Sequence, residues 1–272
     1  MINFPISFLF VPANRPEFFE KAEISKAQSI IFDLEDSVPK EEKNISRKGL
    51  SEFLIDRAKG KEAVIRINSL DTEEGKEDLE TFNTLPKGIF SLIIPKLEEV
   101  NNLQKIPSKL KLILLIETPH AVKKIDTLAS DPRVIGLALG QADLSTSLGS
   151  DMSWDSLLFS RSKIILECAI NNLFSIDGPC MDVSSEKKLL EECRLSRSLG
   201  FNSKMAIHPS QIDAINKIFL PSEEEIGEAK SILKAFSESK EGVILFEGKI
   251  IDTPIVKTME RRLKLAGLKL DF

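Results

Sequence analysis

Short apolar runs alternate with longer amphipathic segments along most of the chain. Eight runs are predicted to be strands, at residues 7–12, 29–34, 63–68, 91–96, 112–118, 134–140, 174–177 and 203–208. Each run is continuously apolar rather than alternating, which is typical of parallel strands buried on both faces. The segments between them carry apolar residues at helical spacing, for example Leu50, Phe53 and Leu54. Eight such units predict an α/β protein whose residues 1–220 form a closed (β/α)8 TIM barrel.

The pattern changes after the eighth unit. Residues 221–225 are predicted to begin a further helix, residues 241–253 a hairpin that turns at 247–249, and Pro254 a last helix. A barrel does not need this tail in order to close. Residues 221–272 are therefore expected to form a C-terminal helix-hairpin-helix segment, which serves either as packing or as a functional lid.

The composition is that of an ordinary globular protein. Its 272 residues are 42% hydrophobic and 29% charged, which excludes the disordered, collagen-like and disulfide-scaffold classes. A net charge of −5, with Lys and Arg interspersed among acids, argues against a nucleic-acid surface. The longest apolar run, Leu112–Ile116, is too short to span a membrane, and we recognise no export signal. Three cysteines without C-x-x-C spacing are typical of reduced thiols, so we expect a cytoplasmic protein.

Polar residues gather where the predicted strands end. In a barrel of this kind, the carboxyl ends of the strands carry the active site. The residues at those ends are Asp33, Glu35, Asp36, Arg66, Asn68, Lys96, Glu117, Asp143, Asp177 and His208. Carboxylates outnumber cations here, and they would repel one another if all were ionised. A divalent cation with all-oxygen ligation, Mg²⁺, is the simplest remedy.

Glu117 and Asp143 are the best candidate ligand pair. They stand at the tips of neighbouring predicted strands, so that both carboxylates can converge on one ion. Two carboxylates leave positions on Mg²⁺ open for water and substrate. The alternative is that these acids cap the helices that follow them.

Arg66 is the strongest single signal in the sequence. It stands between Ile65 and Ile67 in a strand predicted to be buried, where an unpaired guanidinium would be very costly. It therefore contacts an anionic ligand, forms an ion pair with Glu35 or Asp36, or does both. His208 is interpreted as a core histidine rather than a base, and Cys180 is too isolated from any histidine to be a nucleophile.

Several segments resemble the citrate lyase β-subunit-like family of CoA-ester lyases, within the wider HpcH/HpaI aldolase/citrate lyase superfamily. These are FVPANRP (10–16), FDLEDSV (32–38), VIRIN (64–68), IPK (94–96), IET (116–118), GQADL (140–144), AIHPSQ (206–211) and GKIIDTP (248–254). They occur in order over nearly the whole chain. One departure is that many members read Gly-x-Glu-Asp where this chain has Gly140-Gln141-Ala142-Asp143, so that one loop carboxylate is missing.

The resemblance implies a site in detail. It implies Mg²⁺ bound by Glu117 and Asp143, Arg66 in contact with the substrate, and a CoA thioester near the loop that carries Arg15. Glu35, Asp36 and Lys96 are expected to contact and position these residues without binding the metal or the substrate themselves. In related lyases the tail covers a neighbouring subunit and supplies the catalytic acid/base, which is Asp252 here. Homotrimers or larger assemblies are usual in such relatives.

The expected activity is reversible carbon–carbon cleavage of a 3-hydroxyacyl-CoA thioester of the malyl-, citramalyl- or citryl-CoA type. The products would be acetyl-CoA and an α-keto acid. Hydrolysis of the same thioesters stays open. Further alternatives are a class II pyruvate aldolase, which would not need Asp252, and a non-catalytic barrel subunit. The intact set of Arg66, Glu117, Asp143 and Asp252 argues against the non-catalytic alternative.

Overall fold

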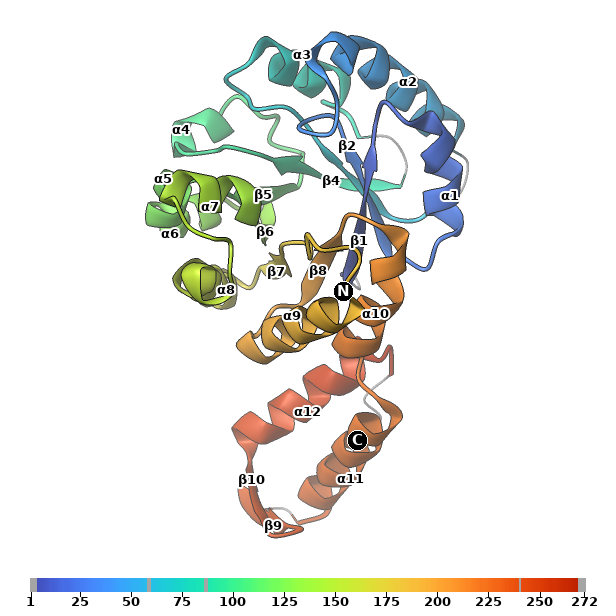
Figure 1. Cartoon of the computed structure of the whole chain (residues 1–272). Coiled ribbons are helices and arrows are strands. Elements are labelled where there is room, and N and C mark those ends of the chain that lie inside the picture. The colour runs from blue at the N-terminus through green and yellow to red at the C-terminus, as the bar shows by residue number, and fades with distance from the viewer. Residues whose placement is uncertain (1–3, 58–59, 86–87, 240, 269–272) are drawn as a thin grey trace. The chain divides into compact units, whose positions relative to one another are not determined.

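The computed structural model describes residues 4–57, 60–85, 88–239 and 241–268, and its central feature is a closed parallel barrel (Figure 1). The strands follow one another in chain order, and β1 pairs with β8 to close the ring. The predicted (β/α)8 barrel is therefore confirmed. Its strands are β1 (Ser7–Pro12), β2 (Ser29–Asp33), β3 (Ala63–Arg66), β4 (Ile89–Ile94), β5 (Leu112–Ile116), β6 (Val134–Leu139), β7 (Phe174–Asp177) and β8 (Ser203–Ala206).

Side chains fill the inside of the barrel. Each strand contributes at least one side chain to a buried cluster that includes Phe8, Ile113 and Met205. Phe4 lies against this cluster and stacks on Phe174 with ring centroids 3.7 Å apart. The interior is thus a packed core, which leaves the carboxyl ends of the strands as the place for a cavity.

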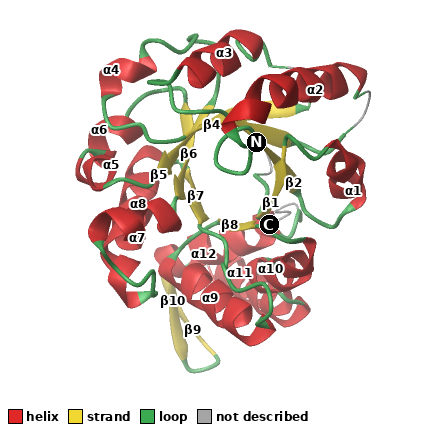
Figure 2. Ribbon diagram, turned by 45° about the horizontal axis from the view of Figure 1, so that its top comes forward, coloured by secondary structure: helices red, strands yellow, loops and turns green. Residues whose placement is uncertain are grey.

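Helices surround the barrel on its outer side (Figure 2). They are α1 (Phe19–Ile24), α2 (Lys43–Asp56), α3 (Glu73–Thr81), α4 (Val100–Leu103), α5 (Pro119–Lys123), α6 (Ile125–Ala129), α7 (Gln141–Leu148), α8 (Leu158–Asn171), α9 (Glu186–Leu199) and α10 (Ile212–Phe219), with short 3₁₀ turns at Pro16–Phe18, Lys40–Glu42, Asp155–Leu157 and Pro209–Gln211.

Two details differ from the sequence prediction. The predicted strands at 63–68, 91–96 and 203–208 each end two residues earlier, so that Asn68, Lys96 and His208 lie in loops. A helix that the periodicity did not reveal, α7, begins directly after β6. Its few apolar residues form no continuous stripe, and its start at Gly140 has no side-chain cap.

The tail, residues 216–272, forms a compact unit of its own. It contains α11 (Glu223–Ser239), the antiparallel strands β9 (Val243–Phe246) and β10 (Lys249–Asp252), and α12 (Thr253–Leu265). Ile232, Leu233, Ile251 and Leu263 are buried in its core. The division falls between residues 215 and 216, inside α10, whereas the sequence suggested a boundary after residue 220. No helix of the described residues is both long and apolar enough to cross a membrane.

The hairpin of the tail turns at Glu247 and Gly248, which both have positive φ, as two-residue hairpin turns favour. Its register places Leu245 opposite Ile250 and Val243 opposite Asp252. Paired residues share a face of the sheet, so that these four side chains lie on one side. The three apolar ones are exposed, Leu245 to 74%. The hairpin therefore presents an apolar surface around Asp252.

A fully buried charge cluster joins β7, β8 and α8. The carboxylate of Asp177 accepts hydrogen bonds from Lys204 Nζ at 2.8 Å and Arg161 Nε at 3.1 Å. Burial opposes ionisation of Asp177, but the charges of Lys204 and Arg161 hold its pKa below the usual range. Arg161 also lies over the ring of Trp154, with its guanidinium carbon 4.4 Å from the ring centroid. Both cations bind this carboxylate deep in the fold, and Lys204 also lies 3.6 Å from Glu192. Asp177 therefore serves the stability of the fold and does not belong to the barrel mouth.

Replacing Asp177 with Asn is expected to destabilise the barrel by about 3–5 kcal/mol, because the buried Arg161 would lose its carboxylate partner and Lys204 would keep only the partly buried Glu192, 3.6 Å away. At roughly 2–4 °C per kcal/mol, the melting temperature should fall by about 6–20 °C. The matched control is Asp213→Asn, which removes an exposed ion pair with Lys26 and should cost less than about 1 kcal/mol. Calorimetric melting of both variants checks this, and equal melting temperatures would contradict it.

Candidate active site

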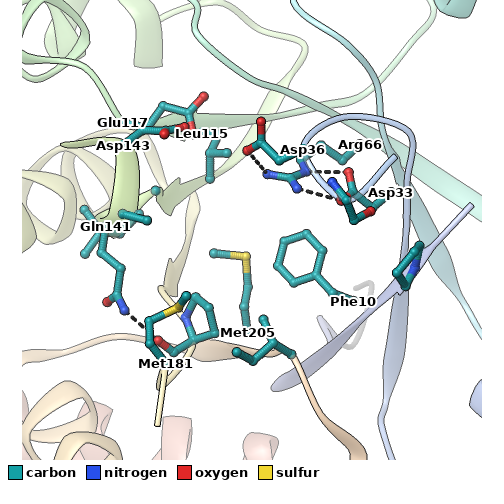
Figure 3. Close-up of a pocket in the computed structure, with 17 residues that line it drawn as sticks. Phe10, Asp33, Asp36, Arg66, Leu115, Glu117, Gln141, Asp143, Met181 and Met205 are labelled. Carbon is teal, nitrogen blue, oxygen red and sulfur yellow. Dashed lines mark hydrogen bonds and ion pairs between the residues drawn. The ribbon is translucent and has the colours of Figure 1, made fainter. Parts of the chain in front are cut away.

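A cavity of about 380 Å³ lies at the carboxyl ends of the barrel strands (Figure 3). Its polar lining comes from the ends of β2 and β3, from the residue after β5 and from the start of α7. These residues are Asp33, Asp36, Ser37, Arg66, Glu117, Gln141 and Asp143. Side chains from strands that are far apart in the sequence thus meet in one place, as the strand-end pattern predicted.

Arg66 is the centre of an ion-pair cluster on one side of this cavity. Its Nε and Nη2 donate to the two carboxylate oxygens of Asp33, each at 2.7 Å, and its Nη1 lies 3.0 Å from Glu35 and 3.5 Å from Asp36. One face of the guanidinium covers the ring of Phe10, 4.9 Å from its centroid. The sequence suggested ion pairs with Glu35 or Asp36, and both exist. The main partner, however, is Asp33.

Asp33 is also what shapes the loop after β2. Its carboxylate accepts backbone N–H bonds from Glu35 at 2.9 Å and from Ser37 at 3.3 Å. Burial opposes its ionisation, but the charge and hydrogen bonds of Arg66 hold the pKa of Asp33 below its usual range. The same carboxylate therefore fixes the guanidinium of Arg66 and holds the loop so that Glu35 and Asp36 contact it as well.

Lys96 closes the cluster from the end of β4. Its ammonium lies 2.7 Å from Glu35, 3.5 Å from Asp36 and 4.0 Å from Asp143. Partial burial favours the neutral amine, yet the hydrogen bond and charge of Glu35 raise the pKa of Lys96. Burial raises the pKa of Glu35, against the charges of Arg66 and Lys96. Lys96 itself has a φ of +53°, an unusual conformation for a residue other than glycine.

Glu117 lacks such a cationic partner at hydrogen-bonding distance among the described residues, although it is almost wholly buried. Its Oε1 accepts the backbone N–H of Lys96 at 2.8 Å. Burial raises the pKa of Glu117 to about 8, and the charges of Glu35 and Asp143 add to this effect. Gly140 makes room for the side chain, because a Cβ there would lie 2.6 Å from the second carboxylate oxygen. The cavity therefore holds a buried carboxyl group whose negative charge is poorly compensated.

Asp143 lies in the first turn of α7, and its side chain is 42% exposed and lines the same cavity (Figure 3). The residue that precedes α7 as its cap is Gly140, and Thr118 rather than Glu117 caps α5. The alternative interpretation, in which Glu117 and Asp143 serve as helix caps, is therefore wrong. Both carboxylates are available to a ligand.

The donor set fits a hard divalent cation. Glu117 and Asp143 offer only oxygen atoms, and the poorly compensated charge at Glu117 is what a bound cation would neutralise. Among the described residues no group of three or more His, Cys, Asp and Glu side chains could hold a metal. An ion held by two carboxylates keeps several positions for water and substrate, as Mg²⁺ commonly does.

Other predicted site residues lie elsewhere. Asp177 is not at the mouth, because Lys204 and Arg161 bind it inside the fold, and the side chain of Asn68 donates to Asp78 instead of lining the cavity. His208 is exposed rather than in the core, since β8 ends at Ala206, and its ring accepts the N–H of Ser210.

Two further predicted residues are not among those that line the cavity. Arg15 is largely exposed, and its nearest carboxylate is Glu17 at 3.9 Å. Asp252 belongs to the tail, where its Oδ1 accepts the N–H of Ile255 and caps α12. The three cysteines are buried free thiols, and burial raises the pKa of Cys168 and Cys193 to about 12, so that neither ionises near neutrality.

Sequence reasoning missed Gln141, Arg161 and Lys204. Gln141 lines the cavity, accepts from Arg161 Nη2 at 3.1 Å and donates to the carbonyl of Pro179 at 2.6 Å. Lys204 had the same signal as Arg66, a cation inside an apolar strand. Arg161 stands on a helix, where a cation is ordinary, and nothing in the sequence marks it as buried.

Comparison with known proteins shows to which family the chain belongs. The family described as HpcH/HpaI aldolase/citrate lyase matches residues 7–209. The chain belongs to this family. The predicted family relationship is thus confirmed. The predicted class of enzyme, a carbon–carbon lyase, is confirmed with it.

Individual relatives match over nearly the full chain. The protein is 32% identical to a (3S)-malyl-CoA thioesterase of Cereibacter sphaeroides, covering 96% of this chain and 94% of that protein. It is 31% identical to the citrate lyase subunit beta of Leuconostoc mesenteroides subsp. cremoris, covering 96% and 93%. The structure of CitE from Mycobacterium tuberculosis in complex with magnesium, acetoacetate and coenzyme A superposes with a TM-score of 0.83 at 31% identity, over 96% of this chain and 98% of that one.

Mg²⁺ binding is expected to compete with a proton on Glu117. With a pKa of about 8 in the metal-free protein, Glu117 is mostly protonated at pH 6.5, and the ion must displace that proton. The affinity for Mg²⁺ should rise by up to about tenfold per pH unit below pH 8 and level off above it. Calorimetric titration from pH 6.5 to 9 measures this.

Two variants sharpen that titration. Glu117→Gln should lose most of the affinity together with its pH dependence. Glu80→Gln, a change on the exposed surface of α3, should leave both unchanged. A wild-type affinity that is flat across the whole pH range would contradict the expectation.

Proposed function

We propose that the protein is a Mg²⁺-dependent lyase that cleaves, or forms, a 3-hydroxyacyl-CoA thioester of the malyl-, citramalyl- or citryl-CoA type. The products are acetyl-CoA and an α-keto acid. The observation that carries the proposal is the meeting of Glu117 and Asp143 with the fixed guanidinium of Arg66 around one cavity. Membership in a lyase family and the magnesium–CoA complex of CitE support it.

The two carboxylates hold the ion and leave the rest of its coordination to the substrate. Bound there, Mg²⁺ would hold the substrate hydroxyl and the neighbouring carboxylate and lower the pKa of that hydroxyl. Glu117 is the buried, fixed ligand. Its Oε1 accepts the backbone N–H of Lys96, and Gly140 packs closely against its side chain. Asp143 lies nearer the solvent, with its side chain 42% exposed.

Arg66 is preorganised to stabilise developing negative charge. Cleavage transfers the hydroxyl proton to water and passes the electron pair of the carbon–carbon bond to the thioester half, which becomes an enolate. The contacts with Asp33, Glu35 and Asp36 fix the guanidinium before the substrate arrives, so little reorganisation is needed during the reaction. Arg66 therefore faces the oxyanion, while Asp33 acts through Arg66 as a positioning residue.

Asp252 is the proposed donor of the proton that the enolate carbon must gain, and in the reverse direction it removes that proton. It stands on the apolar face of the hairpin with Val243, Leu245 and Ile250. Such a face suits a lid that excludes water from a reacting enolate. We propose that it covers the barrel mouth of a second copy in a homotrimer or larger assembly, with CoA at the rim near Arg15.

Hydrolysis is the second candidate, favoured by the similarity to a (3S)-malyl-CoA thioesterase. In that reaction water attacks the thioester carbonyl, the carbon–sulfur bond breaks, and free CoA leaves with no keto acid formed. The same cavity could bind the same thioesters for either reaction. Only the products distinguish the two.

Malyl-, citramalyl- and citryl-CoA, each incubated with Mg²⁺ and with excess EDTA, test the proposal directly. We expect release of keto acid and acetyl-CoA with Mg²⁺, and loss of activity by at least about 100-fold with EDTA. Keto acid and free CoA are followed separately. Free CoA without keto acid would assign the thioesterase, and no consumption of any thioester under any metal condition would reject both.

Changing Asp252 to Asn separates this lyase from a class II pyruvate aldolase. Asn and Ser still cap a helix, so neither Asp252→Asn nor Asp252→Ser should unfold α12, whereas Asp252→Ala costs about 1 kcal/mol. Loss of the proton donor should lower kcat for thioester cleavage by roughly 100- to 10,000-fold. Steady-state kinetics and thermal melting are measured together, and full thioester cleavage by folded Asp252→Asn would contradict the role of Asp252 as proton donor. Cleavage of a 4-hydroxy-2-oxo acid without CoA, unaffected by this change, would favour the aldolase.

A further inference from the structure

The cavity has two chemically different sides (Figure 3). Glu117, Asp143 and Arg66 occupy one side, Phe10 lies against the guanidinium of Arg66, and Met205 and Met181 lie across from the two carboxylates. The apolar lining as a whole consists of Phe10, Pro12, Leu115, Leu139, Ala142, Met205 and Ile207, with Pro179 and the half-exposed Met181. A substrate held by the charged side therefore turns its remaining group toward hydrocarbon and thioether.

The cavity offers little positive charge that could pair with a second substrate carboxylate. Among the described residues that line it, Arg66 is the one cation, and Asp33, Glu35 and Asp36 all contact its guanidinium. Lys96 is not among the lining residues, and its ammonium pairs with Glu35 at 2.7 Å. A further carboxylate placed against the apolar side would find no unengaged cation among the described residues that line the cavity, and beside the buried Met205 it would also lose water, which is costly.

The apolar side is built rather than incidental. The backbone carbonyls of Gly178, Pro179 and Cys180 accept hydrogen bonds from the side chains of Lys204, Gln141 and Gln211, at 2.7, 2.6 and 2.7 Å. These three side chains come from three different elements of the fold. They fix the backbone that carries Met181, although Met181 itself is half-exposed.

Met205 is held just as firmly at the floor of the cavity. It is buried in the barrel cluster with Phe8 and Ile176. Phe10 is fixed from above by the guanidinium of Arg66. Phe10 and Met205, the inner part of the apolar side, are therefore fixed before any ligand binds, whereas the side chain of Met181 is half-exposed.

We propose that Phe10, Met181 and Met205 receive the substituent on the hydroxyl-bearing carbon of the substrate, and that this substituent is a methyl or similarly small alkyl group. The 2-oxo acid released is then of the pyruvate type, rather than one with a second carboxylate or with hydrogen alone. This inference rests on the proposed lyase function and selects among its substrates. Met181 is its specificity-determining residue.

Three thioesters that differ only in this substituent test the proposal: malyl-CoA with hydrogen, citramalyl-CoA with methyl and citryl-CoA with carboxymethyl. One methyl in an apolar pocket is worth about 10- to 200-fold in kcat/KM, so citramalyl-CoA should exceed malyl-CoA by at least about tenfold. It should exceed citryl-CoA by at least about 100-fold. Equal or reversed preferences would overturn the proposal, whichever products appear.

Variants at Met181 test whether this side receives the substituent. Met181→Arg places a cation there, at a half-exposed position that tolerates it, and should raise the ratio of citryl- to citramalyl-CoA turnover by at least about tenfold. Met181→Leu keeps the volume and the apolar character and should keep the wild-type ratio. An unchanged ratio in folded Met181→Arg, checked by thermal melting, would overturn the assignment.

A binding measurement keeps this inference separate from the lyase proposal. Calorimetric titration of the Mg²⁺-loaded protein with pyruvate, glyoxylate and freshly dissolved oxaloacetate needs no turnover. Pyruvate should bind at least about tenfold more tightly than the other two acids. If no thioester is consumed but pyruvate is preferred, the lyase proposal fails and the assignment of the apolar side stands. If thioesters are cleaved without any preference for methyl, the outcome is the reverse.

Discussion

A guanidinium at the end of an apolar strand needs an anion beside it, and the arrangement of the barrel mouth follows from how Arg66 obtains one. Asp33 binds it through both carboxylate oxygens, and the same carboxylate folds the loop after β2 so that Glu35 and Asp36 approach as well. Lys96 then pairs with Glu35. The cations of the mouth are thereby engaged, and Glu117 stays buried with too much negative charge around it.

The barrel contains two clusters of buried charge, and they differ in whether positive and negative charges balance. The balanced cluster stabilises the fold, and the unbalanced one is suited to bind a ligand. Around Asp177, two buried cations meet the buried carboxylate, Lys204 also pairs with Glu192, and no charge is left for a ligand. Around Glu117, carboxylates from three strand ends share a cavity with cations that already have partners. The first cluster holds helix α8 to the barrel, whereas the second has a deficit of positive charge that a metal ion would fill.

Much of this could be predicted from the sequence, because strand ends in a parallel barrel must converge. The barrel and the gathering of Arg66, Glu117 and Asp143 followed from continuous apolar runs interrupted by charge. What could not be predicted was pairing across the fold. Arg161 and Asp177 stand on different elements, and no local pattern says that one neutralises the other. His208 was misplaced because its strand ends two residues before it, a boundary that hydrophobicity does not mark.

The segment that carries Met181 combines a fixed backbone with an unconstrained side chain. Lys204, Gln141 and Gln211 hold the carbonyls before it, while the side chain itself is half in solvent. Substitutions at such a position rarely change stability by more than about 0.5 kcal/mol. Descendants of this protein could therefore acquire a new substrate preference through one codon while keeping the same scaffold. Evolvability is in this sense located at a single site of the barrel rim.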